Sequence, residues 1–144
     1  MPNSLLRLIL VTYFAISATS INAEHSDRVT TDVFRQLAME HAECAAFYLA
    51  SSMCSQASAT LATELKNKFE DMMHRANRFA TEAHTDQRTL TIYGKEVLED
   101  LNKAMGGDCN GMSVVENKYQ LCKALAENFE PRAREILQGL LHRR

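Results

Sequence analysis

Apolar positions recur three and four residues apart along most of this chain, which is the spacing of amphipathic α-helices. The first such stretch carries two adjacent rows: Val33, Leu37, His41, Cys44 and Tyr48, and Phe34, Ala38, Ala42, Ala45 and Leu49. The preceding run Thr30–Asp32 consists of residue types that cap helix N-termini, so the pattern predicts a helix that begins there and a loose polar arm over residues 24–28. Serines cluster around Cys54 and compete for backbone hydrogen bonds, which favours a helix end or a bend at that point.

The same periodicity predicts two further helices. The clearest apolar stripe predicts a helix from about Ala59 to Ala83, and its members are Leu61, Leu65, Phe69, Met72, Ala76, Phe79 or Ala80, and Ala83. The polar run Thr85–Arg88 separates it from a third helix with apolar positions at Leu90, Tyr93, Val97, Leu101 and Met105. Gly106 and Gly107 follow directly, and we expect the third helix to end there because glycine often follows the last residue of a helix.

The last apolar stripe contains a proline. The stripe begins near Ser113 and includes Val115, Tyr119, Cys122, Ala126 and Phe129. Pro131 removes a backbone donor and crowds the preceding turn, so the helix either kinks there or a short fifth helix begins with Pro131 in its first turn. Four amphipathic helices with short connections predict an all-α fold. We expect an antiparallel four-helix bundle, with its last helix kinked or split at Pro131, in a single domain over residues 24–144.

Residues 1–23 have the pattern of a cleavable signal peptide. Arg7 and the amino terminus supply positive charge, and residues 8–18 form an apolar run. This run is shorter than the roughly 20 residues that span a bilayer. Ala23 supplies the small residue that a signal peptidase requires before the cut. We therefore expect an exported protein, periplasmic or secreted, that begins at Glu24 and has no membrane span after cleavage.

Composition and charge narrow the function classes. The chain has five Gly, two Pro and no Trp, which favours long helices over turn-rich sheets. Removal of Arg7 with the signal peptide changes the formal net charge from −2 to −3. Surfaces that bind nucleic acid are usually basic, so a nucleic-acid partner is not expected.

The four cysteines of an exported protein are expected to form two disulfides. Their spacings lack the close Cys-x2-Cys pairs of zinc sites, and the chain contains no Cys-x-x-Cys redox motif. A bridge between Cys44 and Cys54 would have to cover ~15 Å along a continuous helix, which is too far for a disulfide unless the helix ends before Cys54.

The two remaining pairings require different helix directions. Facing residues of antiparallel helices have residue numbers with a nearly constant sum, and Cys44–Cys122 with Cys54–Cys109 fits this relation. The other pairing gives a nearly constant difference, which requires parallel helices. The first and last helices of an up-down-up-down bundle are antiparallel. The sequence therefore predicts the disulfides Cys44–Cys122 and Cys54–Cys109.

One short segment is similar to known proteins. The segment Ala42–Tyr48 (Ala-Glu-Cys-Ala-Ala-Phe-Tyr), with Cys54 ten residues after Cys44, resembles the first helix of small exported bacterial helical proteins of unassigned function. The resemblance implies a bacterial envelope origin and no active site. The cysteine spacing departs from that of insect odorant-binding proteins, which contain a close Cys-x3-Cys pair.

Residues with catalytic or metal-binding chemistry do not form a recognisable motif. His41 and Glu43 match the His-x-Glu of zinc deaminases, but those enzymes also need a Pro-Cys-x-x-Cys segment that this chain lacks. We therefore expect a structural or solvated His41. His74 and His84 lie ten residues apart on different turns and are expected to be surface histidines. The sequence predicts no catalytic residue, no metal site and no cofactor.

The function expected from these patterns is that of a non-enzymatic exported protein that works through contacts with an unknown protein partner. The alternative is a carrier that holds a small apolar ligand in a cavity between its helices, since its aromatic residues and methionines could line such a cavity. An exposed apolar stripe would favour a partner, whereas an internal cavity would favour the carrier.

Processing of the chain tests the export signal. Intact-mass measurement of the protein purified from its native source should show the loss of residues 1–23, because Ala23 completes the signal pattern. A mature protein that retains residues 8–18 would contradict export and would weaken the argument for disulfides.

Overall fold

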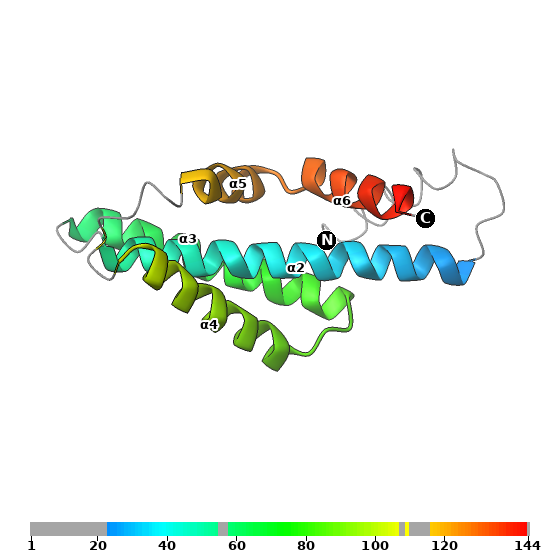
Figure 1. Cartoon of the computed structure of the whole chain (residues 1–144), viewed down its shortest axis with the longest axis horizontal. Coiled ribbons are helices and arrows are strands. Elements are labelled where there is room, and N and C mark those ends of the chain that lie inside the picture. Colours follow the sequence, from blue (N-terminus) through cyan, green and yellow to red (C-terminus); the bar gives the residue numbers. More distant parts are fainter. Residues whose placement is uncertain (1–22, 55–57, 107–108, 110–115, 144) are drawn as a thin grey trace.

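A computed structural model describes residues 23–54, 58–106, 109 and 116–143 of the chain (Figure 1). This part of the chain contains five α-helices and no β-strand, which confirms the all-α prediction. The helices are α2 (Ala23–Cys54), α3 (Ala59–Glu82), α4 (Gln87–Ala104), α5 (Glu116–Glu127) and α6 (Glu130–His142). In the described ranges, we find no helix with the length and apolar character needed to cross a membrane.

The first helix begins earlier than the sequence pattern predicts. Residues 24–28, expected to be a loose arm, belong to α2. Thr30, expected near the N-cap, lies inside the helix, and its hydroxyl donates to the Ser26 carbonyl at 2.9 Å. Val29 and Val33 lie one turn apart and are both fully buried. Their burial explains the longer helix, because it extends the apolar stripe one turn towards the N-terminus.

The bounds of α3 and α4 agree with the predicted ones. Ser58 caps α3 by accepting a hydrogen bond from the Leu61 amide, and Asp86 is the N-cap residue of α4. Gly106 follows α4 with φ of 73°, the left-handed conformation that glycine adopts readily. The predicted helix stop at Gly106 is therefore confirmed. His84 follows α3 with φ of 51°, which is unfavourable for a residue with a side chain.

The C-terminal region consists of two separate helices. α5 ends at Glu127 and α6 begins at Glu130, with Pro131 in its first turn. The Asn128 side chain accepts a hydrogen bond from the Glu130 amide at 3.0 Å, which satisfies a donor at the start of α6. The predicted start of this region near Ser113 lies outside the described residues.

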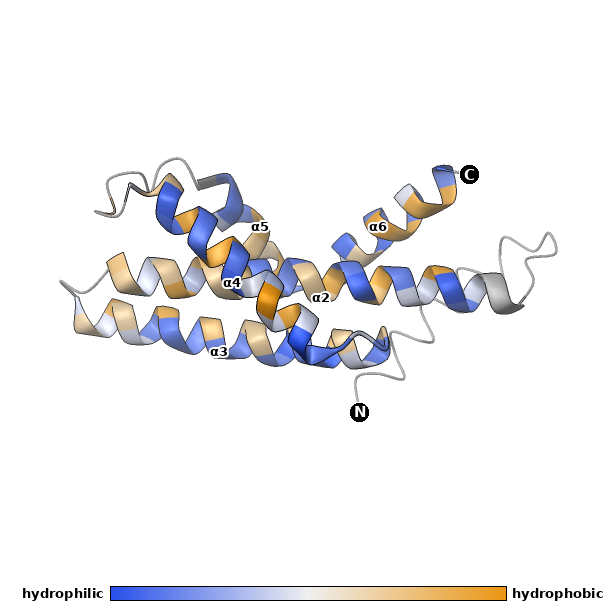
Figure 2. Cartoon of the chain, turned by 60° about the horizontal axis from the view of Figure 1, so that its bottom comes forward, coloured by the Kyte–Doolittle hydropathy of each residue, from blue (hydrophilic) through white to orange (hydrophobic). Residues whose placement is uncertain are grey.

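Helix α2 lies at the centre of the fold. It contacts each of the other four helices, most extensively α3 and then α4. Figure 1 shows α5 and α6 on one side of α2 and α4 on the opposite side, with α3 running behind α2, and the chain direction reverses from α2 to α3 and from α3 to α4. In Figure 2, the polar faces of the surrounding helices alternate with apolar stripes, as expected of amphipathic helices around a shared core.

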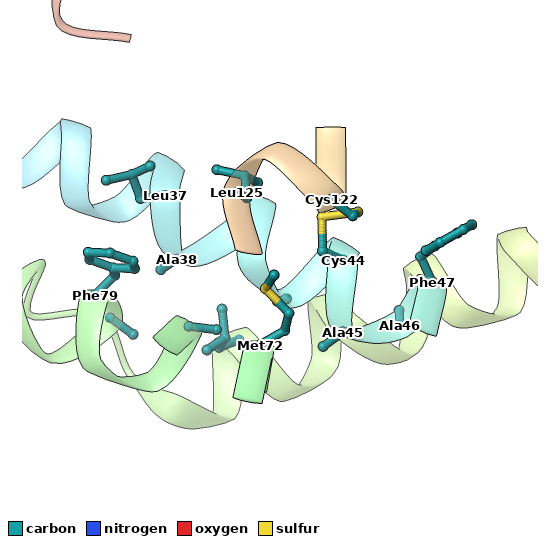
Figure 3. Packing of buried hydrophobic residues seen from close by; sticks show 14 of the residues in the cluster. Leu37, Ala38, Cys44, Ala45, Ala46, Phe47, Met72, Phe79, Cys122 and Leu125 are labelled. Atoms are coloured by element: carbon teal, nitrogen blue, oxygen red, sulfur yellow. A yellow bond between two sulfur atoms is a disulfide. The ribbon is translucent and has the colours of Figure 1, made fainter. Parts of the chain in front are cut away.

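Small side chains allow the other helices to approach α2 closely. Five alanines of α2 are at most 4% exposed: Ala38, Ala42, Ala45, Ala46 and Ala50. Larger side chains from the neighbouring helices pack against this part of α2. Figure 3 shows Met72 and Phe79 reaching it from α3, and Leu125 from α5. Alanine also has the highest helix propensity, so it favours α2 both locally and in packing.

Both predicted cysteine pairs lie at disulfide distance. The Cα atoms of Cys44 and Cys122 are 5.2 Å apart, and those of Cys54 and Cys109 are 5.5 Å apart. The first pair joins the middle of α2 to the middle of α5 (Figure 3). The second joins the end of α2 to the segment between α4 and α5. α2 is helical as far as Cys54, which is the condition under which a Cys44–Cys54 bridge is excluded.

The N-terminal third of α3 is less buried than its stripe predicts. Leu61 is 44% exposed, and Leu65 and Phe69 are only partly buried, whereas Met72 is fully buried. Position explains the exposure of Leu61: α2 ends at Cys54, so the first turn of α3 lies at the tip of the α2–α3 hairpin.

Substitutions along α3 should follow this gradient of burial. We expect Met72→Ala to lower the free energy of unfolding by about 2–5 kcal/mol, because the side chain is fully buried. Leu65→Ala should cost less, and the exposed Lys66→Ala should stay within about 0.5 kcal/mol of the wild type. Urea unfolding measures all three, and equal effects at Met72 and Lys66 would show that the helix is placed with the wrong face inward.

Candidate functional site

Two carboxylates lie on the part of α2 that is most deeply buried. From residue 37 to residue 51, every side chain of α2 is buried except Met39, Glu43 and Leu49. Glu40 is only 8% exposed, and Glu43 is partly buried. A carboxylate at such a position is costly unless it is paired and hydrogen-bonded. The partners of Glu40 and Glu43 therefore decide what this region can do.

Arg132 of α6 forms a bidentate ion pair with Glu40. Its Nε lies 2.9 Å from Oε2 and its Nη2 lies 2.7 Å from Oε1. Gln36, one turn earlier on α2, donates to the same Oε1 at 3.1 Å, and Arg132 Nη1 also donates to Glu135 at 2.8 Å. The hydrogen bond to Glu40, followed by that to Glu135, raises the pKa of Arg132. These charge-assisted bonds hold the first turn of α6 on α2.

Glu43 joins three helices. It accepts hydrogen bonds from the Tyr93 hydroxyl of α4 and from Lys118 Nζ of α5. Burial and then the hydrogen bond to Glu43 raise the pKa of Tyr93, which favours the protonated phenol that donates to Glu43. We call this group of side chains the α2 polar clamp; it consists of Gln36, Glu40, Glu43, Tyr93, Lys118 and Arg132.

The chemistry of the clamp is mainly structural. Each carboxylate is engaged by one cation and one neutral donor, and together the two carboxylates hold α4, α5 and α6 against α2. The part of the chain that the structure describes contains no group of three or more His, Cys, Asp or Glu side chains that could hold a metal ion. The arrangement fixes helix positions with charge-assisted hydrogen bonds.

His41 is part of the core. It is fully buried, and its Nδ1 lies 2.8 Å from the Leu37 carbonyl, which makes Nδ1 the protonated nitrogen. Within the described residues, its Nε2 has no hydrogen-bond partner. The rings of Phe79 and Phe129 lie 5.0 and 6.4 Å from the imidazole, centroid to centroid. Burial lowers the pKa of His41, and the bond to Leu37 opposes the shift. Of the two alternatives expected for His41, structural or solvated, its position in the core excludes the solvated one.

The other residues considered for chemistry lie apart from the clamp. His74 and His84 are exposed on and just after α3, as expected of surface histidines. No sequence motif marks Glu40, Lys118 or Arg132 as functional residues. The available signal was the pair of glutamates three residues apart in a helix that is otherwise apolar on several faces.

The ion pair between Glu40 and Arg132 can be tested with a matched pair of arginines on α6. We expect Arg132→Met to lower the free energy of unfolding by about 1–3 kcal/mol, because it leaves Glu40 without its cation; the estimate is below that for a fully buried pair since Arg132 is 34% exposed. Arg134, two residues later, is 54% exposed, and its Nη2 lies 3.6 Å from Oε2 of Glu130. Arg134→Met should stay within about 0.5 kcal/mol.

A double variant separates loss of the pair from loss of packing. Glu40→Leu combined with Arg132→Met should recover most of the stability, because replacing both partners of a buried pair removes the unpaired charge. If the double variant is as unstable as the sum of the two single variants, the pair contributes nothing through its charges.

Acid should destabilise the protein through His41. A pKa below the ordinary histidine value means that protonation favours the unfolded chain, so the stabilisation is present above about pH 6.5 and is lost as the pH falls. The charges that act on His41 are Glu40 of α2 and Asp71 and Arg75 of α3.

We expect the free energy of unfolding to fall between about pH 7.5 and pH 5.5 in the wild type, and to fall clearly less in His41→Leu. His74→Leu is the control, because His74 is exposed and should leave the wild-type pH dependence intact. Urea titrations at each pH measure the effect, and an unchanged slope in His41→Leu would assign the acid sensitivity to other groups.

No protein-family model, curated protein or solved structure gives a significant match to this chain. The resemblance of Ala42–Tyr48 to small exported bacterial proteins therefore stays a prediction.

Proposed function

We propose that this chain is an exported helical protein that acts through protein–protein contacts and has no enzymatic activity of its own. The observation that carries the proposal is how its side chains are divided between core and surface. The two α2 carboxylates are engaged in holding helices together, whereas large apolar side chains remain on the outside. These exposed side chains are Met53, Leu61, Ile92, Tyr119 and Leu141.

The tip of the α2–α3 hairpin is the best candidate for the contact surface. Met53, in the last turn of α2, is 52% exposed, and Leu61, in the first turn of α3, is 44% exposed. The two helices run in opposite directions, and the ring contact between Phe34 and Phe79 gives their register. The same register puts Met53 and Leu61 at about the same level along the hairpin, and two exposed apolar side chains near one tip favour a protein partner more than scattered ones do.

Export to a bacterial envelope is part of the proposal. The pattern of residues 1–23 supports it, and two cysteine pairs at disulfide distance are compatible with an oxidising compartment. We further propose that residues 24–144 form an antiparallel four-helix bundle in which α5 and α6 together take the place of the fourth helix. The disulfide between Cys44 and Cys122 supports this view, because it ties α5 to α2 at one point.

A carrier of a small apolar ligand is the second candidate function. The observation that favours it is His41 Nε2, which is buried beside Phe79 and Phe129 without a partner among the described residues. A small molecule with one hydrogen-bond donor and an apolar body would satisfy this nitrogen. Native mass spectrometry of protein purified without denaturation distinguishes the two functions, since a carrier should retain a small bound molecule.

The partner proposal is tested by substitution of the hairpin tip. A photo-crosslinking residue placed at position 61 should capture a discrete protein in the native envelope, because Leu61 is exposed near the tip of the hairpin. The matched control is the same residue placed at position 66, on another face of α3. In addition, the double variant Met53→Ser with Leu61→Ser should not be captured when the crosslinking residue is placed at another exposed position of the hairpin tip, and its helical content should be unchanged.

Two results would contradict the proposal. One is equal crosslinking from positions 61 and 66, which would mean that the tip is not a specific surface. The other is a native protein that carries a stoichiometric small molecule and captures no protein, which would favour the carrier.

A further inference from the structure

The two disulfides lie in different environments. Cys44 and Cys122 are both fully buried, and each lies inside a helix. Cys54 is the last residue of α2, Cys109 lies outside the helices, and both are partly exposed. Thiol–disulfide exchange requires a thiolate to reach one of the sulfur atoms. Access to solvent therefore separates the two bridges before any other property is considered.

The backbone at Cys109 also favours opening. Its φ is 66°, the left-handed conformation that is unfavourable for residues other than glycine. Opening the bridge would free Cys109 from the tether that helps to hold it there. By contrast, Cys44 and Cys122 both lie within helices, so their bridge holds no residue in an unfavourable backbone conformation.

A third feature concerns the Cys54 sulfur. The sulfur of Met105 lies 4.0 Å from Cys54 Sγ, and Met105 is almost fully buried. This places a polarisable apolar group against the inner side of the bridge. The Cys54 thiol would keep this contact after reduction, so opening the bridge does not expose a new polar group to the core.

We infer that Cys54–Cys109 is a thiol–disulfide exchange site for an external dithiol, whereas Cys44–Cys122 is a permanent structural bridge. A thiolate of the dithiol attacks Cys54 Sγ, a new sulfur–sulfur bond forms, and the bond to Cys109 breaks. The Cys109 sulfur leaves as a thiolate and takes up a proton. The second thiolate of the dithiol then attacks its own bridged sulfur and releases Cys54, so the dithiol is oxidised to a disulfide as the two cysteines are reduced.

The rest of the fold should survive this reaction. α2 keeps its packing against α3 and α4, and the Cys44–Cys122 bridge and the α2 polar clamp continue to hold α5 and α6. The change is thus confined to the connection between α4 and α5. Cys54 follows Met53 of the proposed contact surface, but reduction of the bridge needs no protein partner, so either proposal can fail without the other.

The test is timed reduction of the folded wild-type protein with dithiothreitol, followed by alkylation and peptide mass spectrometry. Cys54 and Cys109 should be alkylated at least about tenfold faster than Cys44 and Cys122. Low concentrations of urea, below the unfolding transition, should leave the Cys54–Cys109 rate unchanged and should accelerate the other bridge, because the latter opens through unfolding. Equal rates, or faster reduction of Cys44–Cys122, would overturn the inference.

A monothiol probe gives a second readout that needs no variant. Incubation with glutathione should produce a mixed disulfide on Cys54 or Cys109, and an adduct mainly on Cys44 or Cys122 would contradict the assignment. The variant Cys54→Ala with Cys109→Ala should keep the helical content of the wild type. The variant Cys44→Ala with Cys122→Ala should lower the free energy of unfolding more than the first variant does.

Discussion

The burial of α2 on several sides is the constraint on which the rest of the structure depends. Between Leu37 and Ser51 almost every side chain of this helix is inside the protein, and its alanines leave room for neighbours on different faces. A surface helix shows a single apolar stripe, whereas a helix that is apolar on several faces must be surrounded. α2 contacts α3, α4, α5 and α6; in Figure 1 α5 and α6 lie on one side of it, α4 on the opposite side and α3 behind it.

Because α2 is enclosed, its polar residues decide where the neighbouring helices can lie. Glu40 and Glu43 cannot remain solvated once α2 is enclosed, so they draw Arg132, Lys118 and Tyr93 from three different helices. Such pairs add less stability than their number suggests, but they distinguish one placement of α5 and α6 from others, because a shifted helix would leave a carboxylate unpaired. The bridge between Cys44 and Cys122 acts in the same direction by fixing α5 covalently beside α2.

Much of this fold could be predicted from local pattern, and the failures have identifiable causes. The periodicity of Met72, Ala76 and Phe79 and the stop at Gly106 are local signals, and the structure agrees with them. The cysteine pairs followed from the distance along a continuous first helix and from the expected helix directions. The predicted start of α2 was wrong because Thr30 fits an N-cap position as well as a helix interior. The burial of Val29 decides between these two positions. The clamp was missed because Glu40 and Arg132 are 92 residues apart, and no local pattern joins them.

In the part of the chain that the structure describes, α3, α4, α5 and α6 are arranged around α2 and enclose it. Amide hydrogen exchange of the intact, oxidised protein tests this arrangement most directly, because exchange reports the free energy needed to open each hydrogen bond. The amides of residues 41–50 should be the slowest in the chain and should exchange only through global unfolding. The account would be contradicted if these amides exchanged through local opening, or if those of α3 outlasted them.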